Sequence, residues 1–124
     1  MKQSSILFAS PATLDAREAF AQTLARQQET GRARTVLESV LDARRRQQGS
    51  EHGDTLRCSY RLALLFAQAG ELGHARRLLE AILRACARQA SNHGGARLAA
   101  RSALAGIFVR QGDMAALGRL NDSK

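Results

Sequence analysis

The amino-acid sequence predicts an all-α fold, a solenoid of three helical hairpins with about six helices. Two observations lead to this prediction. Apolar residues recur at the helical spacing i, i+3, i+4, i+7 on both sides of a glycine turn at residues 70–73. The same arrangement then repeats at a spacing of 42 residues, as from Phe66 to Phe108. Because a single hairpin cannot bury both of its apolar faces, the repeated hairpins are expected to stack on one another.

The repeat extends across most of the chain without an insertion. A shift of 42 residues places Leu62, Ala63, Leu65, Phe66 and Gly70 on Leu104, Ala105, Ile107, Phe108 and Gly112. The same shift places Gly31, Ala33, Val36, Leu37, Glu38, Val40 and Leu41 on Gly73, Ala75, Leu78, Leu79, Glu80, Ile82 and Leu83. The first hairpin therefore aligns best through its second helix, and the third through its first.

The central hairpin resembles a tetratricopeptide repeat. The family pattern places a large apolar residue, a small residue, an aromatic, a turn glycine and further small and apolar residues in order. Here that order is filled by Leu62, Ala63, Phe66, Gly70, Ala75, Leu79 and Ile82. The period exceeds the family's usual ~34 residues. With the His-containing stretch at residues 49–55, the longer period is similar to the kinesin-light-chain type, which implies a right-handed α-solenoid over about residues 12–120.

The elements of the first hairpin follow from local signals. Residues 1–10 are expected to form an irregular leader, whose apolar residues 6–8 could pack against the domain that spans 11–124. Ser10 followed by Pro11 is a typical helix start, and the first helix should run to about residue 28. Its inward-facing residues are expected to be Leu14, Phe20, Ala21 and Leu24. Gln28 stands where the family has its turn glycine, so Gly31 is expected to turn the chain. The second helix should span 32–47, with Arg44, Arg45 and Arg46 in its last turn, where the helix dipole favours positive charge.

The later hairpins are bounded in the same way, giving repeats at about 11–48, 54–89 and 96–121. Asp54 is expected to cap the third helix, and the fourth should run from residue 73 or 74 to 88. A loop at 90–95 precedes a fifth helix at 96–110, and Asp113 should cap a short sixth helix that ends near 121. Leu117 occupies a position where the pattern has a small residue.

The short last helix predicts an incompletely covered apolar face at the C-terminal end. That face would contain Leu104, Ile107, Phe108, Leu117 and Leu120. Solenoids usually end in a polar capping helix. We therefore expect either a homodimer or a partner that completes the stack. The alternative is an Ala-rich end that needs little cover.

Positive charge is concentrated in the second half of the chain. The net charge is +8, and residues 55–124 contribute +7 of it, from eleven Lys/Arg and four Asp/Glu. Arg outnumbers Lys by seventeen to two. Such a surface favours acidic partners or polyanions, and arginine recognises carboxylates and phosphates. The alternative explanation is the codon bias of a GC-rich bacterial genome.

No pattern in the sequence indicates catalysis, a metal or a cofactor. The two cysteines, Cys58 and Cys86, lack CxxC spacing and are expected to be buried thiols in a reducing cytosol. None of His52, His74 and His93 is spaced with a cysteine as a nucleophile–base pair would require. The apolar run near the N-terminus is too short for a signal peptide or a membrane span. We expect a cytoplasmic, non-catalytic protein without a membrane, metal or cofactor partner.

The resemblance implies a concave groove, lined by the first helix of each hairpin, that holds a peptide or helix of a partner. The family's groove positions carry over to Asp15, Glu18, Gln22 and Arg26, to Arg57, Tyr60, Leu64 and Gln68, and to Ala99, Ser102, Val109 and Arg110. Tyr60 beside Arg57 is typical of an interface hot spot, although Tyr60 could instead pack between hairpins. The set is acidic at one end and basic at the other, which predicts a partner with an acidic segment lying against Arg57 and Arg110.

The sequence therefore favours a protein-binding adaptor, chaperone or regulator, of a size that suits a bacterial or phage accessory protein. The alternative is a nucleic-acid-associated regulator that uses the basic second half. Against it, the sequence lacks a helix-turn-helix signature and the aromatic residues that stack on bases.

Overall fold

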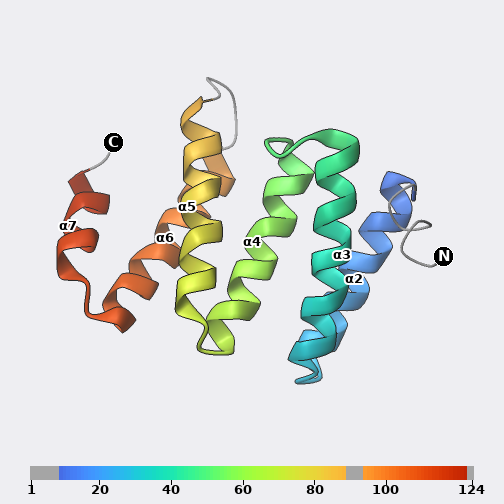
Figure 1. The fold of residues 1–124 in the computed structure, drawn as a ribbon, viewed down its shortest axis with the longest axis horizontal. Coiled ribbons are helices and arrows are strands. Elements are labelled where there is room, and N and C mark those ends of the chain that lie inside the picture. The colour runs from blue at the N-terminus through green and yellow to red at the C-terminus, as the bar shows by residue number, and fades with distance from the viewer. Residues whose placement is uncertain (1–8, 89–93, 123–124) are drawn as a thin grey trace.

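The computed structural model describes residues 9–88 and 94–122, which form six α-helices and no strand. The helices are α2 (Pro11–Arg26), α3 (Thr30–Gln48), α4 (Gly53–Gln68), α5 (Leu72–Arg88), α6 (Gly94–Gln111) and α7 (Met114–Asp122). They pair into three hairpins that stand side by side as a solenoid (Figure 1). The predicted all-α repeat fold is confirmed. The expected leader residues 6–8, and most of the expected loop at 90–95, lie outside the described residues.

Small residues at equivalent positions let the helices approach closely. Ala21 and Ala63 are fully buried in α2 and α4, and Ala33 and Ala75 are fully buried in α3 and α5. Leu, Ile and Phe side chains fill the space between hairpins and form one continuous cluster along the stack. The apolar period that predicts the helices therefore also forms the core.

Successive hairpins are joined by an arginine that recurs with the 42-residue repeat. The guanidinium of Arg34 lies 4.8 Å from the centre of the Phe66 ring and pairs with Glu71 at 3.0 Å. The guanidinium of Arg76 lies 4.7 Å from the centre of the Phe108 ring and pairs with Asp113 at 3.3 Å. Each arginine thus combines a cation–π contact with an ion pair to the next hairpin.

The turns within the hairpins correct one expectation. Gly70 and Gly112 adopt positive φ angles of 82° and 71°, and Gln28 adopts 67° at the equivalent position. Gly31, which was expected to turn the chain, lies inside α3 instead. Gln28 itself takes the left-handed conformation, which costs a side chain of this kind about 1–2 kcal/mol.

The caps agree with the sequence at two helices and differ at a third. The Ser10 hydroxyl accepts the Thr13 N–H at 3.2 Å, and the Asp113 carboxylate accepts the Ala116 N–H at 3.0 Å, as expected. At α4, however, the cap is His52, whose Nδ1 accepts the Asp54 N–H at 3.1 Å. Asp54, expected to be the cap, lies in the first turn, where its negative charge still favours the helix.

The two ends of the stack differ from the prediction. Leu104, Ile107 and Phe108 are only 2–3% exposed, because α7 packs over α6 and buries Ala116 at the crossing. Leu117 and Leu120, the other two residues of the expected apolar face, are only half-buried, so the face is covered in part and a homodimer there stays a prediction. Phe20, expected to face inward, is 48% exposed. The equivalent Leu62 packs against the preceding hairpin, whereas α2 is the first of the described helices.

Candidate functional site

The first helices of the three hairpins, α2, α4 and α6, lie on the same side of the stack, behind α3, α5 and α7 in Figure 1. We call their surface the groove face. All of the groove positions predicted from the sequence belong to these three helices. Their exposure and contacts separate them into a pocket, a buried ionic cluster and an outlying group.

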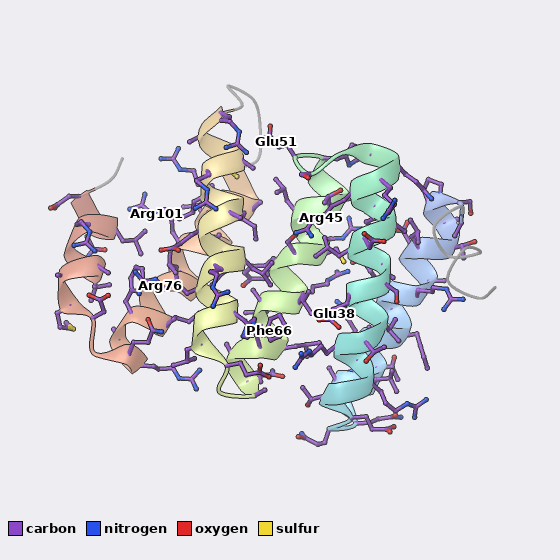
Figure 2. The ribbon with its side chains drawn as sticks, in the orientation of Figure 1. Glu38, Arg45, Glu51, Phe66, Arg76 and Arg101 are labelled. Atoms are coloured by element: carbon purple, nitrogen blue, oxygen red, sulfur yellow. The ribbon has the colours of Figure 1, made fainter. Side chains whose placement is uncertain are left out.

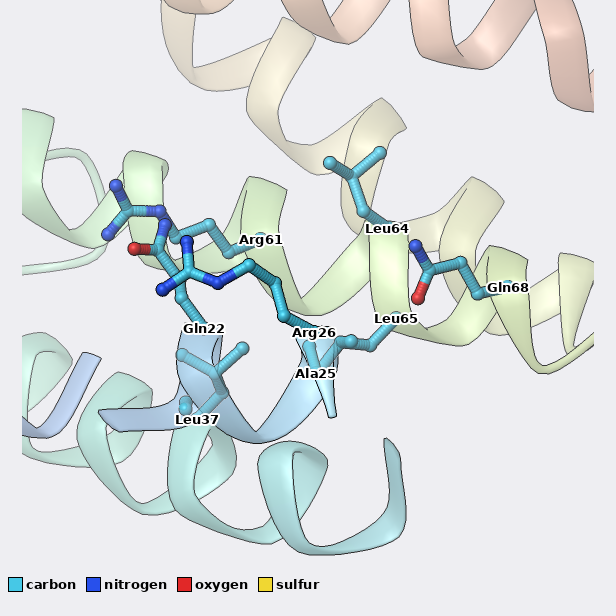
Figure 3. Close-up of a pocket in the computed structure, with 9 residues that line it drawn as sticks. Gln22, Ala25, Arg26, Leu37, Arg61, Leu64, Leu65 and Gln68 are labelled. Carbon is cyan, nitrogen blue, oxygen red and sulfur yellow. The ribbon is translucent and has the colours of Figure 1, made fainter. Parts of the chain in front are cut away.

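The pocket lies between α2 and α4 and has a volume of about 290 Å³. It is lined by Ala21, Gln22, Ala25, Arg26, Leu37, Arg61, Leu64, Leu65 and Gln68. Figure 3 shows Gln22, Arg26 and Arg61 on one side of the pocket, with Leu64 and Gln68 on α4 across from Arg26. Four predicted groove residues, Gln22, Arg26, Leu64 and Gln68, are thus brought together. The lining combines an apolar base with two arginines and contains no carboxylate.

The ionic cluster lies beside the pocket and is centred on Glu18, which is 1% exposed. Its Oε1 accepts from Arg44 Nε at 2.8 Å and from Arg57 Nη2 at 3.3 Å, and its Oε2 accepts from Arg61 Nη1 at 2.5 Å. Arg44 comes from α3, and Arg57 and Arg61 come from α4. One carboxylate on α2 therefore fixes the positions of three arginines on two other helices.

Two further carboxylates complete the cluster. Asp15 accepts from Arg44 at 2.6 Å and from Arg57 at 3.2 Å, and Asp54 pairs with Arg57 at 3.1 Å. Although burial opposes the ionisation of Asp54, the charges of Arg57 and Arg44 and a hydrogen bond from Gln48 lower its pKa. Likewise, burial opposes the charged form of Arg57, but Glu18 and the two aspartates raise the pKa of its guanidinium. Asp54 and Arg57 are thus held in their charged forms, and the three carboxylates of the cluster match its three arginines in number.

This arrangement changes the interpretation of two predicted groove residues. Glu18 is too deeply buried to contact a ligand directly, and it instead positions the arginines around it. Arg57 already pairs with three carboxylates of its own chain, so its charge is not free to pair with an acidic partner. Asp15 remains exposed at the rim.

The other predicted residues lie outside the pocket. Tyr60 is half-buried and packs against the core. On α6, Ser102 is exposed and Val109 is 57% exposed, while Ala99 is half-buried. Arg110 reaches across to α4 and donates to the Ala67 carbonyl at 3.2 Å, next in sequence to Gln68. Arg110 therefore lies nearest to the pocket of the α6 residues in the set.

Two residues of the candidate site were not predicted from the sequence. Arg61 lines the pocket. When the Gln22 amide is oriented with its oxygen toward Arg61, that oxygen accepts hydrogen bonds from Arg61 Nε at 2.8 Å and from Arg61 Nη2 at 3.1 Å. The stripe i, i+4, i+7, i+11 from Arg57 contains Arg61 and not Tyr60, and this spacing could have identified it. Arg44, expected in the last turn of its helix, lies before that turn and is fully buried. It continues the apolar stripe of Ala33 and Leu37, which was the available signal.

The thiols and the remaining polar groups add no second centre. Cys58 and Cys86 are buried free thiols. Burial, together with the negative charge of Glu18, raises the pKa of Cys58 to about 12, and its Sγ donates to the Leu37 carbonyl at 3.7 Å. Within residues 9–88 and 94–122, no group of three or more His, Cys, Asp or Glu side chains is placed to hold a metal ion. None of the described helices combines the length and apolar character needed to cross a bilayer.

Comparisons with known proteins agree on the fold. A family model described as "Tetratricopeptide repeat" matches residues 12–88. No curated protein sequence matches the chain. Among solved structures, nearly identical TPR-like repeats of a kinesin light chain from Podosopora anserina superpose with a TM-score of 0.80 at 23% identity. That match covers 90% of this chain and 52% of the other, so the chain spans about half of the length of the solved one. At this identity the likeness shows the fold alone.

Proposed function

Since the chain belongs to the tetratricopeptide repeat family, we propose that it is a non-catalytic protein-interaction module that holds a peptide or helix of a partner on its groove face. Repeats of this family are generally protein-binding modules and are typically not enzymes. In this proposal the chain acts as a cytoplasmic adaptor, chaperone or regulator. The observation that carries the proposal is the pocket between α2 and α4, which has an apolar base and a polar rim.

The pocket suits one large apolar side chain of the partner. Its volume of about 290 Å³ lies near the lower end of typical ligand pockets. Leu64 is 36% exposed at its edge, and the buried Leu37 and Leu65 lie beneath. An apolar side chain placed here would remove the exposed part of Leu64 from water, which is the main source of affinity at such sites.

The partner segment beside that side chain is proposed to be acidic. Arg26 lies at the pocket and pairs with no carboxylate in the described part of the chain, and its guanidinium donates only to Thr23 at 3.4 Å. Arg110 donates only to a backbone carbonyl. The acidic segment is therefore proposed to lie against Arg26 and Arg110, because Arg57 is already neutralised by Asp15, Glu18 and Asp54. Arginine binds carboxylates through paired hydrogen bonds.

The test is a selection of phage-displayed random linear peptides on the immobilised full chain, with nuclease present. Peptides that combine acidic residues with one large apolar residue should be enriched. Their affinity should fall about tenfold or more on Leu64→Asp or Arg26→Glu, which remove the apolar anchor or the ion pair. The matched control is Arg77→Glu, an exposed arginine on the opposite side of the stack, which should leave the affinity unchanged. No enrichment, or an equal loss in the control, would refute the proposal.

A second candidate function is nucleic-acid association through the basic second half. It is favoured by four exposed arginines that form neither an ion pair nor a hydrogen bond with described residues: Arg77, Arg84, Arg97 and Arg119. Binding through these residues would weaken steeply with salt. Recovering nucleic acid with the tagged chain from a lysate, together with protein partners that disappear after nuclease treatment, would support this candidate over the peptide-binding one.

A further inference from the structure

A second groove lies on the side of the stack opposite the groove face, between α5 and α7, with α6 as its floor. Its volume is about 390 Å³. The residues that line it are Arg76, Glu80, Leu83, Arg84, Leu104, Phe108, Ala116, Arg119 and Leu120. Figure 1 is viewed from this side, with α6 visible between α5 and α7. The apolar residues form the floor and walls, and the charged residues come from the two flanking helices.

The equivalent groove one repeat earlier in the chain can be compared with the α5–α7 groove. A groove of about 330 Å³ lies between α3 and α5, and it is lined by Glu38, Leu41, Asp42, Arg45, Leu62, Phe66, His74, Arg77 and Leu78. Eight of these positions lie 42 residues before a residue that lines the α5–α7 groove. Figure 2 labels Glu38, Arg45 and Phe66 at the first groove and Arg76 at the second. The two grooves are therefore the same structural feature with different side chains.

The difference between the two grooves is mainly one of charge. In the α3–α5 groove, Glu38 and Asp42 balance Arg45 and Arg77. In the α5–α7 groove, Arg84 replaces the equivalent Asp42, so the lining contains three arginines and one glutamate. His74, which stacks on the Phe66 ring with centroids 5.0 Å apart, is replaced by Ala116. The second groove is thus larger and carries net positive charge.

Two of the three arginines remain available to a partner. Arg76 is held by Glu80 at 3.2 Å and by Asp113 at 3.3 Å and lies over Phe108, so it belongs to the junction between hairpins. Arg84 and Arg119 are exposed, and neither forms an ion pair within the described ranges. Arg119 acts on Asp113 only as a more distant charge that helps to lower the pKa of that carboxyl, after the Ala116 N–H and Arg76. Two free guanidinium groups therefore flank one apolar groove.

We propose that the α5–α7 groove is a second protein-binding site, which takes an acidic polypeptide segment with a large apolar residue as its anchor. The apolar residue would lie between the half-buried side chains of Leu83 and Leu120, which form the walls of the groove. Carboxylates on either side of it would pair with Arg84 and Arg119. The charge of the rim and the apolar floor together determine this chemistry, because each one alone would fit a wider range of partners.

A polypeptide fits this groove better than a nucleic acid does. Bases bind non-specifically by stacking on exposed aromatic rings, and the only ring in the lining, Phe108, is 3% exposed and covered by Arg76. The aliphatic floor would be left unfilled by a phosphate backbone. An acidic segment with an apolar anchor satisfies both features.

The test uses the full chain carrying Leu64→Asp, so that peptides cannot bind through the pocket of the groove face. Phage-displayed random linear peptides are selected on this variant at physiological ionic strength, and the affinity of the selected peptides is measured by fluorescence anisotropy. We expect acidic peptides with a large apolar residue. Arg84→Glu combined with Arg119→Glu should weaken their binding about tenfold to a hundredfold, since both ion pairs become repulsive.

The control is Arg45→Glu combined with Arg77→Glu, which changes the net charge equally but alters the α3–α5 groove. This control should change the affinity less than about threefold, because the charges lie outside the proposed site and are screened. An equal loss in both double variants would show general attraction to a basic surface and would overturn the proposal. So would a selection without acidic peptides, or tighter binding of a single-stranded oligonucleotide that is lost on Arg84→Glu with Arg119→Glu. If only the groove-face proposal fails, the peptides selected on the wild-type chain keep their affinity after Leu64→Asp, and that outcome leaves the present test unaffected.

Discussion

The buried pair of Glu18 and Arg44 should contribute to stability as a unit, and a double-mutant cycle can measure this. Arg44 is fully buried and Glu18 is 1% exposed, with 2.8 Å between Arg44 Nε and Glu18 Oε1. Replacing Arg44 with Met removes the buried partner of a buried carboxylate. Breaking such a pair from one side costs about 3–5 kcal/mol. We expect the lower end of that range, since Arg57 and Arg61 still bind Glu18.

The reverse change, Glu18→Leu, should be similarly costly. Arg44 would keep Asp15 at 2.6 Å and Asp54 at 3.7 Å, but Asp15 is largely exposed and is a weaker partner. The double variant Glu18→Leu with Arg44→Met replaces both charges with apolar groups. Such replacements are often neutral or even stabilising. We therefore expect the double variant to lie within about 1 kcal/mol of the wild type, which corresponds to a coupling energy of several kcal/mol.

The free energy of unfolding is measured by urea denaturation followed by circular dichroism. The control is Arg45→Met, the exposed neighbour of Arg44, which should change this free energy by less than about 0.5 kcal/mol. If the loss in the double variant equals the sum of the two single losses, the pair does not act as a unit. If Arg44→Met costs less than about 1 kcal/mol, the burial of Arg44 seen here is itself refuted.

Three further predictions concern the turn at Gln28, the exposed position of Phe20 on α2 and the buried thiol of Cys58. Gln28→Gly should stabilise the chain by about 1 kcal/mol by relieving its left-handed backbone, and Gly70→Gln should destabilise it by a similar amount; urea denaturation of both variants measures this. Leu62→Ala should lower the free energy of unfolding by about 2–5 kcal/mol. Phe20→Ala, at the equivalent but exposed position, should lower it by less than about 1.5 kcal/mol, and equal losses of stability for the two variants in thermal unfolding would contradict their difference in burial. Cys58, whose pKa is raised to about 12 by burial, should not react with a disulfide reagent at mildly alkaline pH until denaturant is added. Because this raised pKa keeps the thiol neutral in the folded chain, its contribution to stability should be lost as the pH rises above about 9 toward 12.

Apolar periodicity and repeat spacing predicted the helices because both depend on residues that are close in sequence or related by a fixed shift. The spacing of 42 residues aligns Phe66 with Phe108 and Gly70 with Gly112, and the structure places both pairs in equivalent surroundings. The same spacing also aligns Gln28 with these glycines. Glycine preference nevertheless pointed to Gly31, because propensity cannot show that packing on both sides forces a glutamine into the left-handed region.

The burial of charged side chains could not be predicted from the sequence. Arg44 continues an apolar stripe, but an arginine there is ordinarily assigned to solvent, because its burial requires a partner. That partner, Glu18, lies on another helix 26 residues earlier, and no local rule connects the two. Glu18 was in turn assigned to the groove because its helical position matched the family pattern. The place of these residues on the first helix of each hairpin could thus be predicted, but the ion pairs between them could not.

The 42-residue repeat also separates positions that maintain the fold from positions free to vary. Arg34 and Arg76 make the same contacts at successive junctions, so their identity is explained by stacking. Asp42 aligns with Arg84, and both lie on the second helix of their hairpin. Stacking does not fix the charge at this position, since the two copies of the hairpin carry opposite charges there. The exchange of Asp42 for Arg84 lies in the α5–α7 groove, which is why a partner is expected there as well as on the groove face.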